Sequence, residues 1–124
     1  MNRKILITAV ILIAALAAIY FLRAEIAERR FKGKADELAG KIPEKYREAY
    51  EEEFYYNVNK FWSAYENGLV SENDLIDVTD YMDDLNRKEE LSRKEVFDFL
   101  DYVSRIYTEE IKKRHEEEYR KGPG

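Results

Sequence analysis

An uninterrupted apolar run near the N-terminus restricts the possible folds of this chain more than any other feature. From Ile5 to Leu22 the sequence reads ILITAVILIAALAAIYFL, without a charged residue. As a helix this run would span about 27 Å at about 1.5 Å per residue, close to the hydrocarbon core of a bilayer at about 30 Å. A core helix of a soluble protein normally shows a polar face over such a length. We therefore predict a membrane anchor over residues 1–22.

A cleaved export signal is the alternative interpretation of the same segment. Arg3 and Lys4 form a basic start, and Ala15 and Ala17 fit the A-x-A pattern of a cleavage site. The apolar run continues past that site to Leu22, which is long for the apolar part of a signal peptide. We favour an uncleaved anchor.

The orientation of the anchor is less constrained. Basic residues after the run outnumber those before it, which by the positive-inside rule would keep the following domain in the cytoplasm. The opposite topology and the cleaved signal would both export the domain. We expect the domain on the extracytoplasmic side of the membrane.

Composition sets the class of the remaining chain of about 100 residues. The whole chain has 45% hydrophobic and 38% charged residues, and this is enough apolar material for one folded domain. The absence of cysteine excludes disulfides, thiolate metal sites and a cysteine nucleophile. A net charge of −5 argues against nucleic acid as a partner, because a phosphate backbone requires a basic surface.

Apolar spacing and turn residues predict an all-α fold of about three to four helices after the anchor. A periodicity of three and four continues after residue 22 and predicts an amphipathic stalk helix over residues 23–41, with Gly33 as a point of weakness and Gly40 as its end. A second helix is expected from about Pro43 to Asn67, ending at Gly68. Its predicted core stripe consists of Tyr46, Tyr50, Phe54, Val58, Phe61 and Tyr65, extended on one side by Trp62 and Tyr55.

Two serines mark the starts of two further helices. Ser71 with Asp74, and Ser92 with Glu95, have the spacing of a capping box. The expected inner face of the third helix consists of Leu75, Val78, Met82 and Leu85, and that of the fourth consists of Val96, Phe99, Leu100, Val103, Tyr107 and Ile111. The acidic helical domain is thus predicted over residues 42–111, followed by a polar, fraying tail over residues 112–124.

The third and fourth helices share a pattern at an offset of 21 residues. VSENDLIDVTDYM from Val70 aligns with LSRKEVFDFLDYV from Leu91, and the matches include Asp77 with Asp98 and Tyr81 with Tyr102. Convergence on a capped amphipathic helix and an internal duplication both explain this similarity, and the sequence leaves both open.

Candidate binding residues are acidic and aromatic. Asp77, Asp80 and Asp84 recur at helical spacing, so their carboxylates share one face, and Asp98 with Asp101 repeats the first pair. Such a face suits a basic partner, whereas helical spacing is unsuitable for wrapping calcium. A solvated acidic face without a partner is the alternative interpretation. Tyr55 and Tyr56 are the aromatic residues least well explained by a core, because Tyr56 falls on the charged side of its helix.

Motifs for enzymatic chemistry are missing from the sequence. His115 has no second histidine to complete a zinc site, and the chain has neither a nucleophile-elbow motif nor a glycine-rich phosphate loop. We expect no catalytic residue, cofactor or metal.

These features together predict a non-enzymatic, single-pass interaction module: a scaffold, an adaptor or an accessory subunit of a membrane complex. Its expected partners are the lipid bilayer and either another protein or further copies of the chain. An exported ligand- or metal-binding protein is the alternative.

Overall fold

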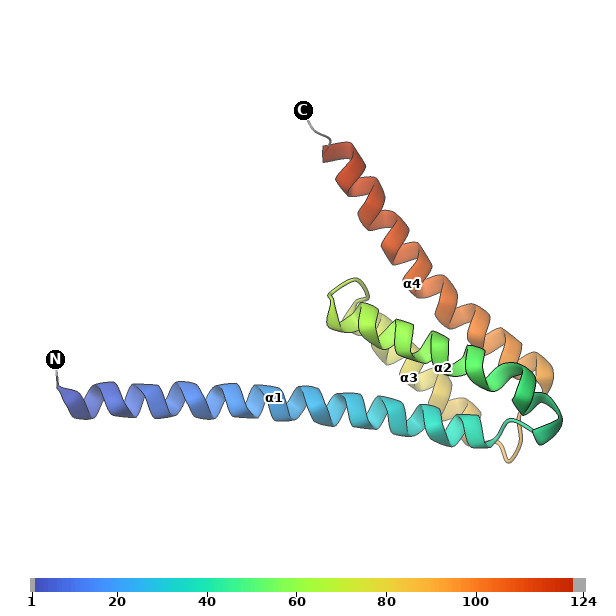
Figure 1. Ribbon diagram of the computed structural model, residues 1–124, viewed down its shortest axis with the longest axis horizontal. Helices are drawn as coiled ribbons and strands as arrows, with labels where there is room; N and C mark the ends of the chain where they lie inside the picture. The colour runs from blue at the N-terminus through green and yellow to red at the C-terminus, as the bar shows by residue number, and fades with distance from the viewer. Residues whose placement is uncertain (1, 122–124) are drawn as a thin grey trace. The chain divides into compact units, whose positions relative to one another are not determined.

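The computed structural model describes residues 2–121. Of these residues 87% are helical, in four helices and without a strand. The helices are α1 (Arg3–Gly40), α2 (Glu44–Glu66), α3 (Glu72–Asn86) and α4 (Arg93–Lys121) (Figure 1). The all-α prediction, with one candidate transmembrane helix, is confirmed.

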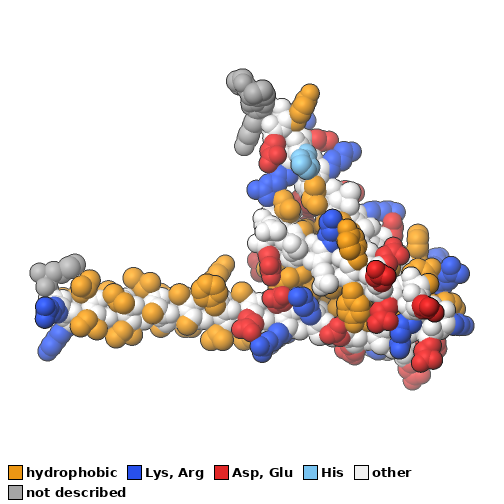
Figure 2. Space-filling view, in the orientation of Figure 1, with side chains coloured by type: hydrophobic (Ala, Val, Ile, Leu, Met, Phe, Trp, Pro, Cys, Tyr) orange, Lys and Arg blue, Asp and Glu red, His pale blue; other side chains and the backbone are white. Residues whose placement is uncertain are grey.

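The chain divides into two compact units, residues 1–31 and residues 32–124. The first unit is the N-terminal part of α1, whose apolar side chains are exposed from Ile5 to Leu22. Figure 2 shows hydrophobic side chains along this part of the helix, with basic ones at its beginning. The Thr8 hydroxyl donates a hydrogen bond to the Lys4 carbonyl at 2.8 Å, so this polar group is satisfied within the helix. α1 is long and apolar enough to cross a membrane.

The second unit begins at Lys32, inside the segment predicted as a stalk, rather than at residue 42. Ala35 and Leu38 are 1% and 0% exposed, and Ala39 and Ile42 are also buried. The C-terminal turns of α1 are therefore a core helix of the second unit. Gly33 does not interrupt α1.

α2 follows the prediction to within a residue, with Pro43 immediately before it and Gly68 in the left-handed region at φ 73° shortly after it. The centre of the predicted stripe is buried, including Phe54, Val58 and Phe61, and so is Trp62. The stripe's outer tyrosines, Tyr46, Tyr50 and Tyr65, are half-buried.

Both predicted capping boxes are present. The Ser71 hydroxyl accepts the Asp74 N–H at 3.1 Å, and the Ser92 hydroxyl accepts the Glu95 N–H, also at 3.1 Å. In return, the Asp74 and Glu95 carboxylates accept the serine N–H groups at 3.4 Å and 3.0 Å. These contacts fix the first turns of α3 and α4, whose inner faces are buried at Val78, Met82, Leu85, Val96, Phe99, Leu100, Val103 and Tyr107.

α4 continues to Lys121 instead of ending near Ile111. Side chains 112–120 are exposed, so this extension adds nothing to the core. Lysine, arginine and glutamate are good helix formers, so their intrinsic propensity supports this extension of the helix. Gly122 to Gly124, the rest of the predicted tail, lie outside the described residues.

Polar contacts attach the end of α1 to the other helices of the second unit. The Lys34 ammonium pairs with the Asp83 carboxylate at 2.8 Å, and the Lys34 carbonyl accepts the Asn86 amide at 3.2 Å. The Lys41 carbonyl accepts the Leu91 N–H at 3.0 Å. Arg47 donates to the Gly40 carbonyl at 3.1 Å, which satisfies one of the free carbonyls at the end of α1.

Candidate functional site

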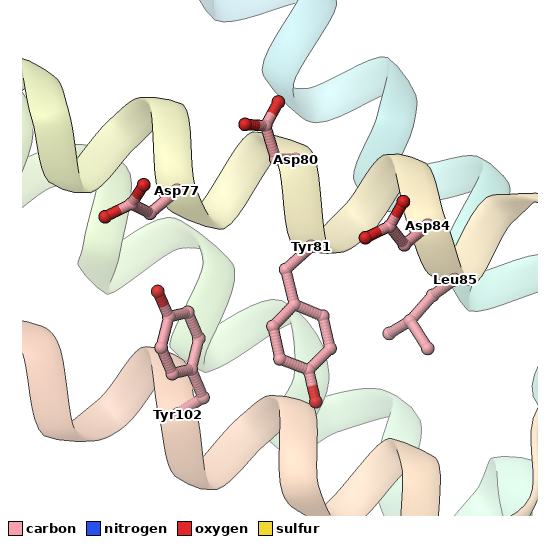
Figure 3. A pocket seen from close by; sticks show the side chains of 6 residues that line it. All are labelled: Asp77, Asp80, Tyr81, Asp84, Leu85 and Tyr102. Atoms are coloured by element: carbon pink, nitrogen blue, oxygen red, sulfur yellow. The ribbon is translucent and has the colours of Figure 1, made fainter.

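A hollow of about 360 Å³ lies where α3 packs against α4. It is lined by Asp77, Asp80, Tyr81, Asp84, Leu85 and Tyr102 (Figure 3). The three aspartates come from one face of α3, as their spacing predicts, and the Tyr102 ring comes from α4. We call this set of six residues the acidic hollow.

A pair of tyrosine rings forms the aromatic wall of the acidic hollow. Tyr81 and Tyr102 stack with their centroids 5.1 Å apart and their planes at 30°. Tyr81 also packs at 5.4 Å against the buried ring of Phe99, so the pair is anchored to the core. Both rings are half-buried, which leaves part of each accessible from the hollow.

Carboxylates surround these rings and make the potential at the hollow negative. Burial, then the charges of Asp98 and Glu95, raise the pKa of Tyr81 above 10.0. Burial, then the charges of Asp77 and Asp74, raise the pKa of Tyr102 in the same way. Burial disfavours a charge of either sign, whereas the negative charges of the carboxylates favour a cation beside these rings.

The contacts of the two tyrosines are reciprocal in terms of the 21-residue pattern. Tyr81 and Tyr102 are equivalent positions and stack on each other, while Asp98 acts on Tyr81 and its equivalent Asp77 acts on Tyr102. The sequence similarity between α3 and α4 therefore has a counterpart in their packing.

Some of the predicted acidic residues form ion pairs with basic residues of the same chain, and others do not. Asp84 pairs with Arg87 at 3.4 Å, and Asp101 pairs with Arg105 at 2.7 Å. Asp77 and Asp80 have no ion pair with any residue that the structure describes. Asp98 and Asp101 lie on α4 outside the lining of the acidic hollow.

Tyr55 and Tyr56, the predicted aromatic contacts, lie on α2 and do not line the acidic hollow. The Tyr55 hydroxyl donates a hydrogen bond to the Asp36 carboxylate at 2.9 Å, which connects α2 to the end of α1. Tyr56 is 58% exposed, as its position on the charged side predicts, and its hydroxyl accepts a hydrogen bond from Lys60 at 3.2 Å.

Sequence reasoning missed the aromatic half of this site. The 21-residue pattern matches Tyr81 with Tyr102, but it does not indicate that either residue binds a partner. Their recurrence at equivalent positions was the signal available, because only the packing of α3 on α4 brings the two rings together.

No cluster of three or more His, Cys, Asp or Glu side chains suitable for a metal ion occurs within residues 2–121. His115 is exposed on the C-terminal part of α4. Comparisons of the chain with protein-family models, with curated proteins and with solved structures gave no match.

The chemistry of the acidic hollow suits an organic cation. Carboxylates accept hydrogen bonds from a guanidinium or an ammonium group, and a tyrosine face attracts either through its ring quadrupole. Arginine satisfies both kinds of contact, since its planar group bonds carboxylates in pairs and stacks on rings.

Proposed function

We propose that this chain is a non-enzymatic interaction module, anchored in a membrane by α1, whose acidic hollow binds a basic side chain of a partner protein. The observation that carries this proposal is the combination of unpaired Asp77 and Asp80 with the stacked Tyr81–Tyr102 pair in one hollow. In this role the chain acts as a scaffold, an adaptor or an accessory subunit of a membrane complex.

Desolvation explains why the tyrosines matter to this proposal. Ion pairs between fully exposed groups contribute about 0–1 kcal/mol, because water and salt screen them. A cation held against a ring surface is partly shielded from water, and cation–π contacts add about 0.5–2 kcal/mol. The Tyr81–Tyr102 wall therefore gives the hollow an advantage over an equally acidic stretch of open helix.

The anchor supports the membrane part of the proposal. α1 is of sufficient length and apolarity to span a bilayer. We place the helical domain on the extracytoplasmic side, where Asp77 and Asp80 would meet basic segments of envelope or surface proteins. Alkaline carbonate washing tests the anchor, because an integral protein stays with the membrane pellet.

Crosslinking in native membranes tests the binding site. The triple variant Asp77→Asn, Asp80→Asn and Asp84→Asn removes three charges from exposed positions with little change in volume. We expect crosslinked partner adducts to fall about tenfold, since the loss of several charge-assisted contacts corresponds to about 1.4 kcal/mol or more.

The control is the triple variant Glu51→Gln, Glu52→Gln and Glu53→Gln, which removes three charges from an exposed stretch of α2. This control variant should keep the crosslinked adducts, because the three glutamates lie on α2 and do not line the acidic hollow. Equal loss in both triple variants would show that only the overall charge matters and would refute the acidic hollow as the site.

A further inference from the structure

The extension of α4 beyond the core carries a charge pattern that is its own complement. Around His115 the sequence reads Ile-Lys-Lys-Arg-His-Glu-Glu-Glu-Tyr, with three bases before the histidine and three acids after it. Ile111 and Tyr119 lie four residues to either side. When the segment is read from its C-terminal end, the acids take the positions of the bases and the bases take the positions of the acids. Figure 2 shows the histidine among basic and acidic side chains near the end of α4.

This part of α4 is exposed, and only Asn67 and Leu69 of the described chain line a hollow beside it. Side chains 112–120 are exposed, and Tyr119 is 89% exposed. Lys112, Arg114, Glu116 and Glu118 form no ion pair with another described residue. An aromatic ring and four unpaired charges are thus available on one exposed length of helix.

From this complementarity we propose that two copies of the chain associate through an antiparallel pairing of their α4 ends, centred on His115. Ile111, His115 and Tyr119 recur every four residues and form the central stripe. The two-fold axis of such a pair would bring His115 of each copy together and place Tyr119 of one copy beside Ile111 of the other.

The charges on both sides of this stripe fit an antiparallel pair and do not fit a parallel pair in register. At about 100° per residue, Lys112 and Glu116 lie on one flank of the stripe, and Arg114 and Glu118 lie on the other. Around a two-fold axis, each flank faces the same flank of the second copy. Lys112 then faces Glu116 of the second copy and Arg114 faces Glu118, and each pair occurs twice. A parallel pair in register would place like charges at the same height.

Two hollows beside the stripe accommodate the second helix. One, of about 350 Å³, is lined by Asn67, Leu69, Ile111, Arg114, His115 and Glu118. The other, of about 390 Å³, is lined by Lys112, His115, Glu116, Tyr119 and Arg120. His115 belongs to both, so the stripe runs between them. In the pair, Tyr119 of the second copy fills the first hollow against Leu69 and Ile111.

The proposed contact between the two α4 ends is small, so we expect it to form only when both copies are anchored in the same membrane. Three layers of side chains bury less than the 1,200–2,000 Å² or so of a typical stable complex. Anchoring both copies in one membrane raises their effective concentration and compensates for the small area. This step rests on the anchoring proposed above, whereas the charge pattern is separate from the acidic hollow.

Cysteine crosslinking of the full chain in lipid vesicles tests the register, since the sequence has no cysteine of its own. We expect a mixed disulfide when Ile111→Cys and Tyr119→Cys are reconstituted together, and none from Ile111→Cys alone. His115→Cys alone should crosslink, whereas Lys113→Cys, on the far side of the helix, should not. A disulfide requires Cα atoms about 4.4–6.8 Å apart, so only cysteine pairs that lie opposite each other in the antiparallel pair should crosslink.

Charge exchange tests the complementarity. Lys112→Glu with Arg114→Glu makes the segment acidic, and Glu116→Lys with Glu118→Lys makes it basic. Each variant alone should lose self-association by about tenfold or more, and the two mixed together should regain it. The matched control exchanges Lys113→Glu and Glu117→Lys on the opposite face and should self-associate like the natural chain.

The outcomes separate this inference from the proposed function. Protein that is extracted from the vesicles by carbonate refutes the anchor. Protein that stays anchored but gives no mixed disulfide above the Lys113→Cys background refutes the α4 pairing. Strong crosslinking of Ile111→Cys to itself would indicate a parallel pair and would equally overturn the proposal.

Discussion

A single hydrogen bond joins two polar side chains inside the core. The Tyr107 hydroxyl donates to the Asn57 side-chain carbonyl at 2.7 Å, with Asn57 5% and Tyr107 7% exposed. The Asn57 amide donates to the Glu53 carbonyl at 2.8 Å, so both of its polar ends have partners. A buried bond of this kind fixes α2 against α4 in one register, because a shift would leave both groups unsatisfied.

Removal of the Tyr107 hydroxyl should lower the free energy of unfolding, although it deletes only one atom besides hydrogen. Tyr107→Phe keeps the ring and leaves the Asn57 carbonyl buried without its donor, a loss of about 1–3 kcal/mol in the free energy of unfolding. Chemical denaturation followed by circular dichroism measures it. Tyr56→Phe is the control, because Tyr56 is largely exposed and its change should stay within about 0.5 kcal/mol. Equal effects in both variants would contradict a special role for the buried bond.

The sequence identified apolar core residues better than polar ones. Phe54, Val58 and Phe61 were predicted from a spacing of three and four that places them on one face. Asn57 gave no such signal, because its burial depends on Tyr107, 50 residues away in the sequence. Apolar periodicity indicates which face of a helix is buried, but it gives no information on a hydrogen bond to a residue of another helix, such as Tyr107.

Among the helices, the starts of α3 and α4 depend only on residues that are close together in the sequence. Each depends on one serine and one acid three residues later, with the serine hydroxyl 3.1 Å from a backbone nitrogen in both. Because no other element is needed, the sequence predicted both starts. The acidic hollow was predicted only in part: α3 alone arranges Asp77, Asp80 and Asp84, but the tyrosine wall requires α4 as well.

Loss of either serine cap should destabilise the domain. Ser71→Ala and Ser92→Ala each remove a hydroxyl that accepts a backbone N–H, at a cost of about 1 kcal/mol. Ser63→Ala is the control, since Ser63 is exposed within α2 and alanine is the better helix former. Thermal unfolding of the three variants compares them. Unchanged midpoints for both cap variants would mean that these hydrogen bonds contribute nothing measurable.

On the scale of the molecule, the end of α1 belongs to the folded domain as much as to the anchor. A fragment that starts at Lys32 keeps Ala35, Leu38 and the Lys34–Asp83 ion pair, and should unfold cooperatively. A fragment that starts at Ile42 lacks them and exposes the core they cover. Loss of buried leucine contacts costs about 2–5 kcal/mol per side chain, a large part of the stability of a domain of this size.

Circular dichroism of the two fragments during heating checks this expectation. Leu38→Ala in the longer fragment provides the intermediate case, with a lowered midpoint and cooperativity retained. Identical midpoints for the two fragments would mean that residues 32–41 are dispensable, as expected of a stalk and not of a core helix.

Trp62 gives the protein an intrinsic fluorescent reporter for these measurements. It is the sole tryptophan, it is 5% exposed within α2, and its ring lies 5.1 Å from that of Tyr65. The N-terminal part of α1, by contrast, contains only tyrosine and phenylalanine as aromatic residues. Selectively excited tryptophan emission therefore monitors the folding of residues 32–121 alone, without interference from the anchor and without any added label.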